Sequence, residues 1–329
     1  MTIDVVIGNP PYQRMDGAGV QGGQAIYHLF CEQAEQISEQ FIFIIPTRWM
    51  TDTPRGVSVD WMKKMRVRSD YVNIIEYIKG QQIFNNTGQQ GGVGIIHVDH
   101  NHDGDCNITI VDENKTEFRI GMLATNGVII RNSDTLSIVK NIEAVDGYGY
   151  DSIERLIGTT RTFSKAYRDG SDVYLKTNWE GFVFNKDDEH YIRYFTKKAL
   201  TGGKEVYISE ADLAPGTLET AKQFKLFINS AFGGKLPVPF IGGTDCACSQ
   251  AFLPIFGDEV DNIEKANNFI AYFETNFLKK LVVELRTTQH INKSLFQLVP
   301  MQNFSNNSDI DWKCSIEDID KQLNNKYNI

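Results

Sequence analysis

The chain lacks long hydrophobic runs and paired cysteine spacings. No apolar stretch in its 329 residues approaches the roughly 18–20 residues of a membrane span, and no signal peptide is visible. The five cysteines form an odd set without paired spacing, which fits a reducing compartment better than a disulfide framework. We therefore expect a cytoplasmic protein without contact with a membrane.

An excess of positive charge is also missing. The chain has 33 basic and 42 acidic residues, which gives a net charge of −9. This balance argues against a protein held on nucleic acid by bulk charge alone. It leaves sequence-specific DNA binding open, because electrostatic steering depends on local patches. The composition is 41% hydrophobic and 23% charged, as in ordinary globular proteins, and the length allows two domains.

A metal-ligand spacing is absent too. Histidine, aspartate and cysteine gather in one stretch, at His97, Asp99, His100, His102, Asp103, Asp105 and Cys106. They fall on an expected strand end and turn, where Asp and Asn serve the backbone, and they match no fixed ligand spacing. The pair Cys246 and Cys248 is too close for the usual zinc knuckle. We expect core or loop there and no metal site.

What the chain does contain, close to its first residue, is Asn9-Pro10-Pro11-Tyr12. The apolar β-branched run before Gly8 predicts a buried strand. Two consecutive prolines fix φ twice and remove two N–H donors, which predicts a stiff loop. Such a loop would lie at the C-terminal end of a strand, where open α/β sheets bind ligands.

This loop would present two acceptors beside a flat ring. Asn9 offers a side-chain carbonyl, Pro10 a backbone carbonyl, and Tyr12 an aromatic face. That set suits a planar amine, such as the exocyclic amino group of a nucleobase. The alternative is an ordinary turn made of turn-forming residues.

Strand and helix patterns alternate in the first third of the chain. They predict helices over 25–39 and 61–68, and strands over 41–45, 71–77, 91–98 and 107–112. The first helix has its expected apolar stripe at Ile26, Leu29, Phe30, Ala34 and Ile37. The last strand is expected to pair with the one before it, across a turn at residues 103–104. We therefore predict an α/β fold, the C-terminal half of a doubly wound, Rossmann-like sheet that ends in a hairpin.

The character of the chain changes after residue 112. Strands become short, turns frequent and aromatics common, which predicts an α+β domain over 113–329 after a first domain over 1–112. The clearest helix is expected over 262–285, with a length of about 35 Å. A capping-box-like start at Asp261-Asn-Ile-Glu264 precedes it. A polar loop and a short strand over 294–300 would follow it.

Asn9-Pro10-Pro11-Tyr12 and the order of elements behind it resemble the gamma-type N6-adenine DNA methyltransferases. The likeness is greatest to the methylase and recognition half of fused restriction–modification enzymes. It implies a site-specific enzyme that transfers a methyl group from S-adenosylmethionine to a flipped adenine in double-stranded DNA. It also implies that Asn9 and the Pro10 carbonyl accept hydrogens of the N6 amine while Tyr12 stacks on the base.

Two further segments resemble parts of that family. Ile83-Phe84 resembles its eighth motif, so Phe84 is a candidate for the second aromatic face of the base, with a core phenylalanine as the alternative. The segment after the expected long helix resembles target-recognition domains. Its side chains can bond base edges or phosphates: Arg286, Thr287, Thr288, Gln289, His290, Asn292 and Lys293. A polar helix-to-strand connection is the alternative there.

The family places its cofactor site before Asn-Pro-Pro-Tyr, and the residues before Gly8 are too few to hold it. We therefore predict that this chain alone binds S-adenosylmethionine weakly or not at all. It would be a fragment, half of a split enzyme completed by a partner chain, or a degenerate relative that binds DNA or protein without chemistry. Cleavage would likewise need a nuclease from another domain or chain. The competing function is a non-catalytic DNA-recognition component without its own cofactor site.

Overall fold

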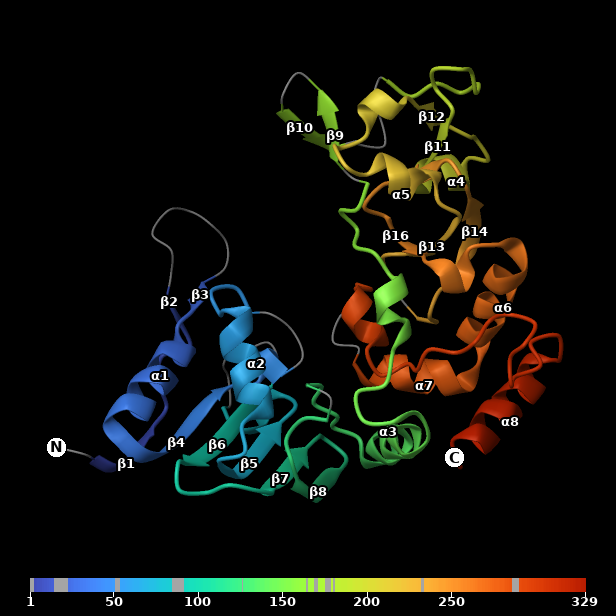
Figure 1. Ribbon diagram of the computed structural model, residues 1–329. Helices are drawn as coiled ribbons and strands as arrows, with labels where there is room; N and C mark the ends of the chain where they lie inside the picture. The colour runs from blue at the N-terminus through green and yellow to red at the C-terminus, as the bar shows by residue number, and fades with distance from the viewer. Residues whose placement is uncertain are drawn as a thin grey trace. The chain divides into compact units, whose positions relative to one another are not determined.

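The computed structural model describes residues 3–14, 23–50, 54–84, 92–125, 127–163, 165–168, 171–174, 179, 181–231, 234–285 and 290–329. The chain divides into two compact units, unit 1 over Met1–Ser137 and unit 2 over Ile138–Ile329. Figure 1 shows the elements of both units in chain order. Unit 1 ends later than the predicted boundary at 112 because strand β8 (Thr116–Gly121) belongs to its sheet.

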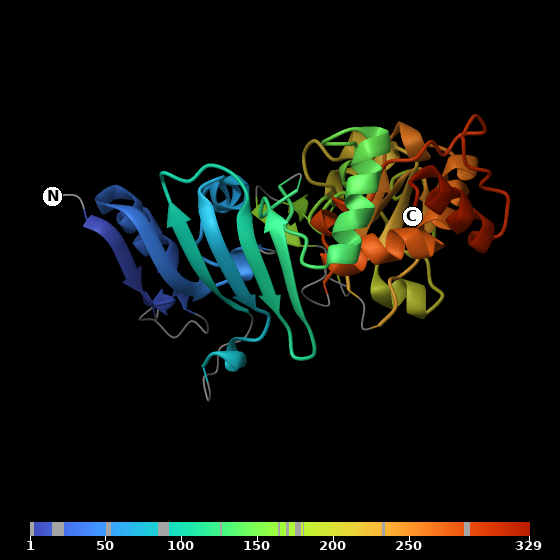
Figure 2. The same cartoon turned by 90° about the horizontal axis from the view of Figure 1, so that it is seen from below.

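Unit 1 is built on a six-stranded mixed sheet in the order β1-β4-β6-β5-β7-β8. Its other strands are β1 (Ile3–Gly8), β4 (Ser38–Pro46), β5 (Tyr71–Tyr77), β6 (Val93–Asp99) and β7 (Cys106–Val111). The pairs β1–β4 and β5–β7 are parallel, and the other neighbours are antiparallel. Figure 2 shows the sheet with β1 at its outer end. The predicted mixed α/β character is confirmed.

The predicted pairing of the strand over 107–112 with its predecessor is wrong. Strand β5 lies between β6 and β7, and β7 runs parallel to it. The cause is the connection after β6, whose Asp99 and Gly104 N–H groups donate to the carbonyls of Asp70 and Ser69, each at 3.0 Å. These bonds carry the connection across the start of β5. The hairpin that ends the sheet is β7–β8, with Ile110 opposite Glu117.

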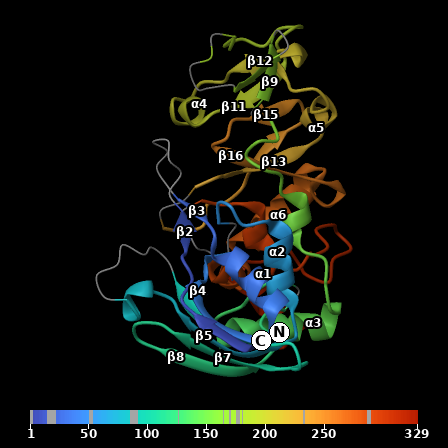
Figure 3. The same ribbon diagram turned by 90° about the vertical axis from the view of Figure 1, so that its left-hand side faces the viewer.

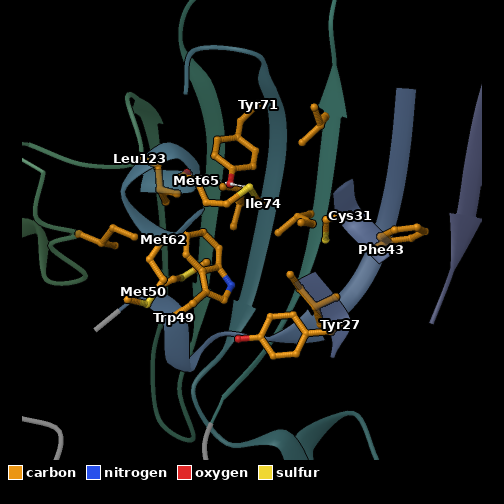
Figure 4. Close-up of a cluster of buried hydrophobic side chains, with 14 of the residues drawn as sticks. Tyr27, Cys31, Phe43, Trp49, Met50, Met62, Met65, Tyr71, Ile74 and Leu123 are labelled. Atoms are coloured by element: carbon orange, nitrogen blue, oxygen red, sulfur yellow. Dashed lines mark hydrogen bonds between the residues drawn. The ribbon is translucent and has the colours of Figure 1, made fainter. Parts of the chain in front are cut away.

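Two helices, α1 (Tyr27–Ile37) and α2 (Val59–Val67), lie on the same face of this sheet (Figure 3). They bury one cluster with the inward residues of the strands, part of which Figure 4 shows: Tyr27, Cys31, Phe43, Trp49, Met50, Met62, Met65, Tyr71, Ile74 and Leu123. On the opposite face Ile7, Phe118 and Ile120 are 70%, 62% and 64% exposed. Helices on both faces, which a doubly wound sheet requires, stay a prediction.

The buried stripe of α1 differs from the predicted one. Leu29, Phe30 and Ile37 are largely exposed, whereas Tyr27 and Cys31 are buried with Ala34. The helix is rotated so that the polarizable sulfur and the aromatic ring, rather than the aliphatic side chains, meet the sheet. Only Ala34 belongs to both stripes.

Unit 2 contains short strands in separate small sheets. These are β12-β11-β15 (Tyr207–Ile208, Ile192–Phe195, Cys246–Cys248), β14-β13-β16 (Phe240–Gly243, Lys225–Asn229, Phe252–Phe256) and β10-β9 (Ser171–Tyr174, Lys165–Arg168). Its helices are α4 (Lys197–Thr201), α5 (Leu218–Lys222), α6 (Ile263–Glu274), α7 (Asn276–Glu284) and α8 (Ile316–Lys326), and α3 (Ser133–Asp146) crosses the boundary with unit 1. Short strands with many turns agree with the predicted change of character.

The predicted single helix over 262–285 is wrong, because it breaks at Thr275 between α6 and α7. Thr275 has extended backbone angles, φ −66° and ψ 151°, and its hydroxyl donates to the Tyr272 carbonyl. The Asp320 carboxylate accepts from the N–H groups of Asn276 and Phe277 at 2.8 and 2.9 Å. A threonine cap and a carboxylate at the start of α7 stabilise a second helix instead of a continuous one.

The strand predicted over 294–300 is wrong as well. A 3-10 helix, η6 (Lys293–Phe296), occupies its first part, and Pro300 makes a single bridge with Ser152. The Val299 N–H donates to the Phe296 carbonyl at 3.0 Å, which keeps the segment turned. The pair Cys246 and Cys248 lies buried in β15, in agreement with the core position expected for it.

Candidate functional site

The Asn-Pro-Pro-Tyr loop begins where β1 ends, next to β4. Gly8 lies opposite Phe43 in the parallel pair, so the loop leaves the sheet at the carboxyl ends of both strands. The Tyr12 carbonyl accepts from the Ile26 N–H at 3.1 Å. The short strands β2 (Gln13–Arg14) and β3 (Gln24–Ala25) then pair with each other. Both contacts hold the loop against the start of α1.

A cavity of about 160 Å³ lies beside this loop. Its lining comes from the loop, from the start of α1 and from the ends of strands: Tyr12, Gln13, Gly23, Ala25, Tyr27, Pro46, Arg48, Pro54, Arg55 and Gly92. The volume is below the roughly 300–1,000 Å³ of sites for drug-sized ligands. The cavity, here called the loop pocket, therefore suits a small planar group better than a large cofactor.

Gly92 fixes the back of the loop pocket. Its carbonyl accepts from the Thr47 N–H at 3.0 Å, which joins the end of β4 to the start of β6. A Cβ at position 92 would lie 2.4 Å from Thr47 Oγ1 and 2.9 Å from the Tyr77 carbonyl oxygen. Any side chain there would push these elements apart.

Two phenols and two guanidinium groups give the loop pocket its polarity. Burial raises the pKa of Tyr12 to about 12. Burial also raises the pKa of Tyr27, with the neighbouring Cys31 adding to the rise and Arg48 opposing it. Both phenols are therefore protonated at neutral pH. Neither hydroxyl has a hydrogen-bond partner within the part of the chain that the structure describes.

The structure places the predicted catalytic and base-binding residues unequally. Tyr12 lines the loop pocket, whereas Asn9 is exposed at the mouth of the same loop and Pro10 is buried behind it. Phe84 is half-buried after η2 (Gly80–Gln82), its N–H donates to the Gly80 carbonyl, and it is not in the pocket lining. The roles given to Asn9, Pro10, Pro11, Tyr12 and Phe84 stay predictions.

Sequence reasoning missed Tyr27, Arg48 and Arg55 as lining residues. A signal for Arg48 was available, because it follows the end of β4 and ligands of open α/β sheets bind at such ends. Tyr27 gave no such signal, since an aromatic residue in a helix is ordinarily part of a core. Arg55 lies in a loop without regular structure, where spacing carries no information.

The predicted recognition segment is described only in part. Arg286, Thr287, Thr288 and Gln289 lie outside the described residues. His290 forms a bridge with Ala231, and Asn292 accepts from the Ser294 hydroxyl at 2.5 Å. Lys293 lies 3.6 Å from a carboxylate oxygen of Glu154 and is half exposed. His290, Asn292 and Lys293 are thus exposed near one another, and their contact with DNA stays a prediction.

Comparison with known proteins places part of the chain in a class. Residues 1–84 of the 329 match the model of the Eco57I restriction-modification methylase family. The resemblance inferred from Asn-Pro-Pro-Tyr is thereby confirmed for this part of the chain. It includes the loop, the first half of the sheet and both helices of unit 1.

One curated relative is an uncharacterized adenine-specific methylase of Mycoplasma pneumoniae (strain ATCC 29342 / M129 / Subtype 1). It is 25% identical over 159 residues, which are 44% of this chain and 37% of the relative. The chain thus spans well under two thirds of that protein's length, and what the whole relative does is not carried over.

Two solved structures cover nearly all of this chain. One is the type IIG restriction endonuclease BpuSI, at 12% identity and a TM-score of 0.33, with 97% of this chain and 48% of that chain covered. The other is the type IIL restriction-modification enzyme MmeI in complex with DNA, at 10% identity and a TM-score of 0.42, with 99% and 54% covered. These values are too low to support an argument about function. Among the helices that the structure describes, none is long and apolar enough to span a membrane.

Proposed function

We propose that this chain forms the target-adenine site of a site-specific DNA N6-adenine methyltransferase of a restriction–modification system. The loop pocket carries the proposal, because it lies at the carboxyl ends of β1 and β4 and Tyr12 of the Asn-Pro-Pro-Tyr loop lines it. The methylase family match of residues 1–84 supports the reaction class, and the adenine-specific relative supports the base.

In this proposal the loop holds the amine of a base that has left the DNA stack. Asn9 and the Pro10 carbonyl accept the two hydrogens of N6, which leaves the nitrogen lone pair directed away from the loop. Tyr12 stacks on the base and offsets part of the unstacking cost, a few kcal/mol. Phe84 would close the other face. Because Tyr12 stays protonated, it acts as a neutral ring rather than as a base.

S-adenosylmethionine would supply an electrophilic methyl group on its sulfonium sulfur. The loop pocket does not fit this molecule, because its lining contains no acidic side chain to bond ribose hydroxyls and its volume is small. We therefore place the donor elsewhere, on a further segment or a partner chain beside β1. Within the described residues β1 is the outer strand of the sheet, so that side has unpaired backbone groups.

Unit 2 would read the DNA sequence in this proposal. Exposed polar and cationic side chains near η6, among them His290, Asn292 and Lys293, can bond base edges or phosphates. Double-stranded DNA is the substrate, and a nuclease for the restriction step would belong to another domain or chain.

The test is transfer of labelled methyl groups to adenine in duplex DNA, by this chain alone and with the products of neighbouring genes. Asn9→Ala should lower the rate about 100-fold or more, as the loss of one well-placed transition-state contact does. Tyr12→Ala should also abolish transfer. Asn107→Ala is the matched control, because Asn107 is an exposed asparagine on β7. Full activity of both loop variants would contradict the proposal.

The second candidate is a DNA-recognition component that performs no chemistry. The missing acidic side chain in the loop pocket favours it, since this chain then offers no site for the methyl donor. It predicts sequence-selective DNA binding that survives Asn9→Ala and requires residues 287–293. Labelled methyl on adenine in any of these mixtures would exclude it.

A further inference from the structure

We propose that Tyr27 and Arg48 contact the target nucleotide, Tyr27 by a hydrogen bond to a ring nitrogen of the base and Arg48 by an ion pair with a phosphate. The inference rests on the proposed function of the loop pocket and names two residues that the sequence did not indicate. It makes the pocket a site for an adenine nucleotide rather than for a neutral base alone.

Tyr27 is the first residue of α1 and is 2% exposed. Its ring packs edge-on against Trp61, with ring centroids 6.1 Å apart, so the side chain is held in place (Figure 4). The hydroxyl has no hydrogen-bond partner among the residues described. A buried donor without a partner is unfavourable, and an acceptor atom placed in the pocket would relieve that cost.

The charge of the lining selects the kind of ligand. The chain as a whole has a net charge of −9, yet the lining has two arginines and no acidic residue. Cationic ligands are therefore repelled, and anions or groups rich in acceptor atoms are attracted. A purine nucleotide has both features, with ring nitrogens that accept and a phosphate that is negative.

Arg48 occupies the position that a phosphate contact requires. It directly follows Thr47 at the end of β4, opens η1 (Arg48–Met50) and is exposed at the pocket. Its charge acts on the Tyr27 phenol, which shows that the two groups are near each other. A guanidinium fork matches phosphate oxygens better than a lysine ammonium does.

Arg55 supports the same wall from the opposite side. Its carbonyl accepts from the Ala25 N–H at 2.9 Å, which ties its loop to the residues just before α1. The side chain is exposed at the pocket and adds positive charge there. We assign the phosphate contact to Arg48 because it lies within electrostatic reach of Tyr27.

The test compares adenosine with adenosine 5′-monophosphate as probes of the full-length chain, with affinities measured by ligand-observed NMR. Tyr27→Phe should weaken both probes by roughly five- to ten-fold, the worth of one hydrogen bond. Arg48→Gln should remove the advantage of the monophosphate over adenosine and leave adenosine unchanged. Tyr148→Phe and Lys64→Gln are the controls, because both side chains are exposed and lie outside the lining.

Two outcomes would overturn the inference. One is unchanged binding in Tyr27→Phe, and the other is an equal loss of both probes in Arg48→Gln. Absence of binding by the wild-type chain at millimolar probe would overturn it as well. Unchanged thermal melting of Tyr27→Phe excludes a folding defect as the cause of weaker binding.

The source of the nucleotide is settled by competition. A single-stranded oligothymidylate with one central deoxyadenosine should displace the monophosphate, and Tyr27→Phe should weaken that displacement. Displacement only by free nucleotides would assign the pocket to a mononucleotide and contradict the contact with DNA. Asn9→Ala separates this inference from the proposed function: normal methyl transfer by Asn9→Ala contradicts the proposed function, whereas normal binding by Tyr27→Phe contradicts only the inference.

Discussion

The two units bury charged side chains in different ways. In unit 1 charges are paired with each other: Glu76, 2% exposed on β5, accepts two hydrogen bonds from Arg131 at 2.6 and 2.8 Å. In unit 2 buried charges serve the backbone: Lys225, fully buried, donates to the carbonyls of Ala221 and Gln223, and Asp320 caps α7. Removing one charge thus leaves an opposite charge unpaired in unit 1 and backbone groups unpaired in unit 2.

The largest expected effect is on the buried ion pair of unit 1. Arg131→Met should lower the free energy of unfolding by about 3–5 kcal/mol, because Glu76 would stay buried without its cation. Urea unfolding followed by hydrogen exchange of the β5 peptides measures it. The double variant Glu76→Leu with Arg131→Met should recover much of the loss, since no charge then remains buried. Equal stability of the wild type and Arg131→Met would remove the contrast between the units.

A smaller effect is expected at the helix break of unit 2. Asp320→Ala should cost about 1.5–3 kcal/mol, because two N–H groups at the start of α7 lose a charged acceptor. Hydrogen exchange at Asn276 and Phe277 should accelerate with it. Glu317→Ala, an exposed position on the same helix, should change stability by less than about 0.5 kcal/mol. Similar values for both variants would contradict the capping role of Asp320.

The third prediction concerns acid pH and the paired charges of unit 1. Burial alone would raise the pKa of Asp70, but the hydrogen bonds and charge of Arg68, with a bond from His100, bring it below its usual range. A lowered pKa stabilises the fold above the ordinary value of about 3.9, and this part of the stability is lost as the pH falls through the folded value.

The urea midpoint of unit 1 should therefore drop below about pH 4, and less so in Asp70→Asn. The control is Asp105→Asn, an exposed aspartate whose side chain makes no such pair. An identical pH slope in the wild type and Asp70→Asn would show that Arg68 does not stabilise unit 1 through this carboxylate.

The smallest effect is expected on the uncovered face of the sheet in unit 1. Phe118→Ser should shift stability by no more than about 0.5 kcal/mol, because the ring is 62% exposed. Ile108→Ser on the neighbouring strand, 2% exposed in the core cluster, should cost several times as much. Chemical denaturation of both variants gives the ratio. A large loss in Phe118→Ser would mean that this face is covered in solution.

Sequence patterns predicted the local parts of this molecule well. The strands β1, β4 and β5 follow β-branched and aromatic runs, and α6 begins at the expected cap, Asn262, whose side chain accepts from the Lys265 N–H. The helix break at Thr275 was missed because the apolar stripe continues through it. Asp320, which stabilises the break, is 44 residues away from Asn276.

The same distinction applies to the candidate site. Tyr12 belongs to a contiguous motif, so its place at a strand end could be predicted from neighbouring residues. Tyr27 and Arg48 come from other elements and meet Tyr12 only because β4 pairs with β1 and α1 starts beside the loop. The face that α1 buries depends on the sheet beneath it, which its own hydrophobic spacing did not reveal.

The outer strand β1 has a physical consequence for the protein in concentrated solution. Ile3, Val5 and Ile7 are 43%, 39% and 70% exposed, and no described strand pairs with the outer side of β1. A row of apolar side chains beside free N–H and carbonyl groups is a template on which strands of other molecules add. The solubility limit of this protein is therefore set at β1, by edge-to-edge association, rather than by its net charge.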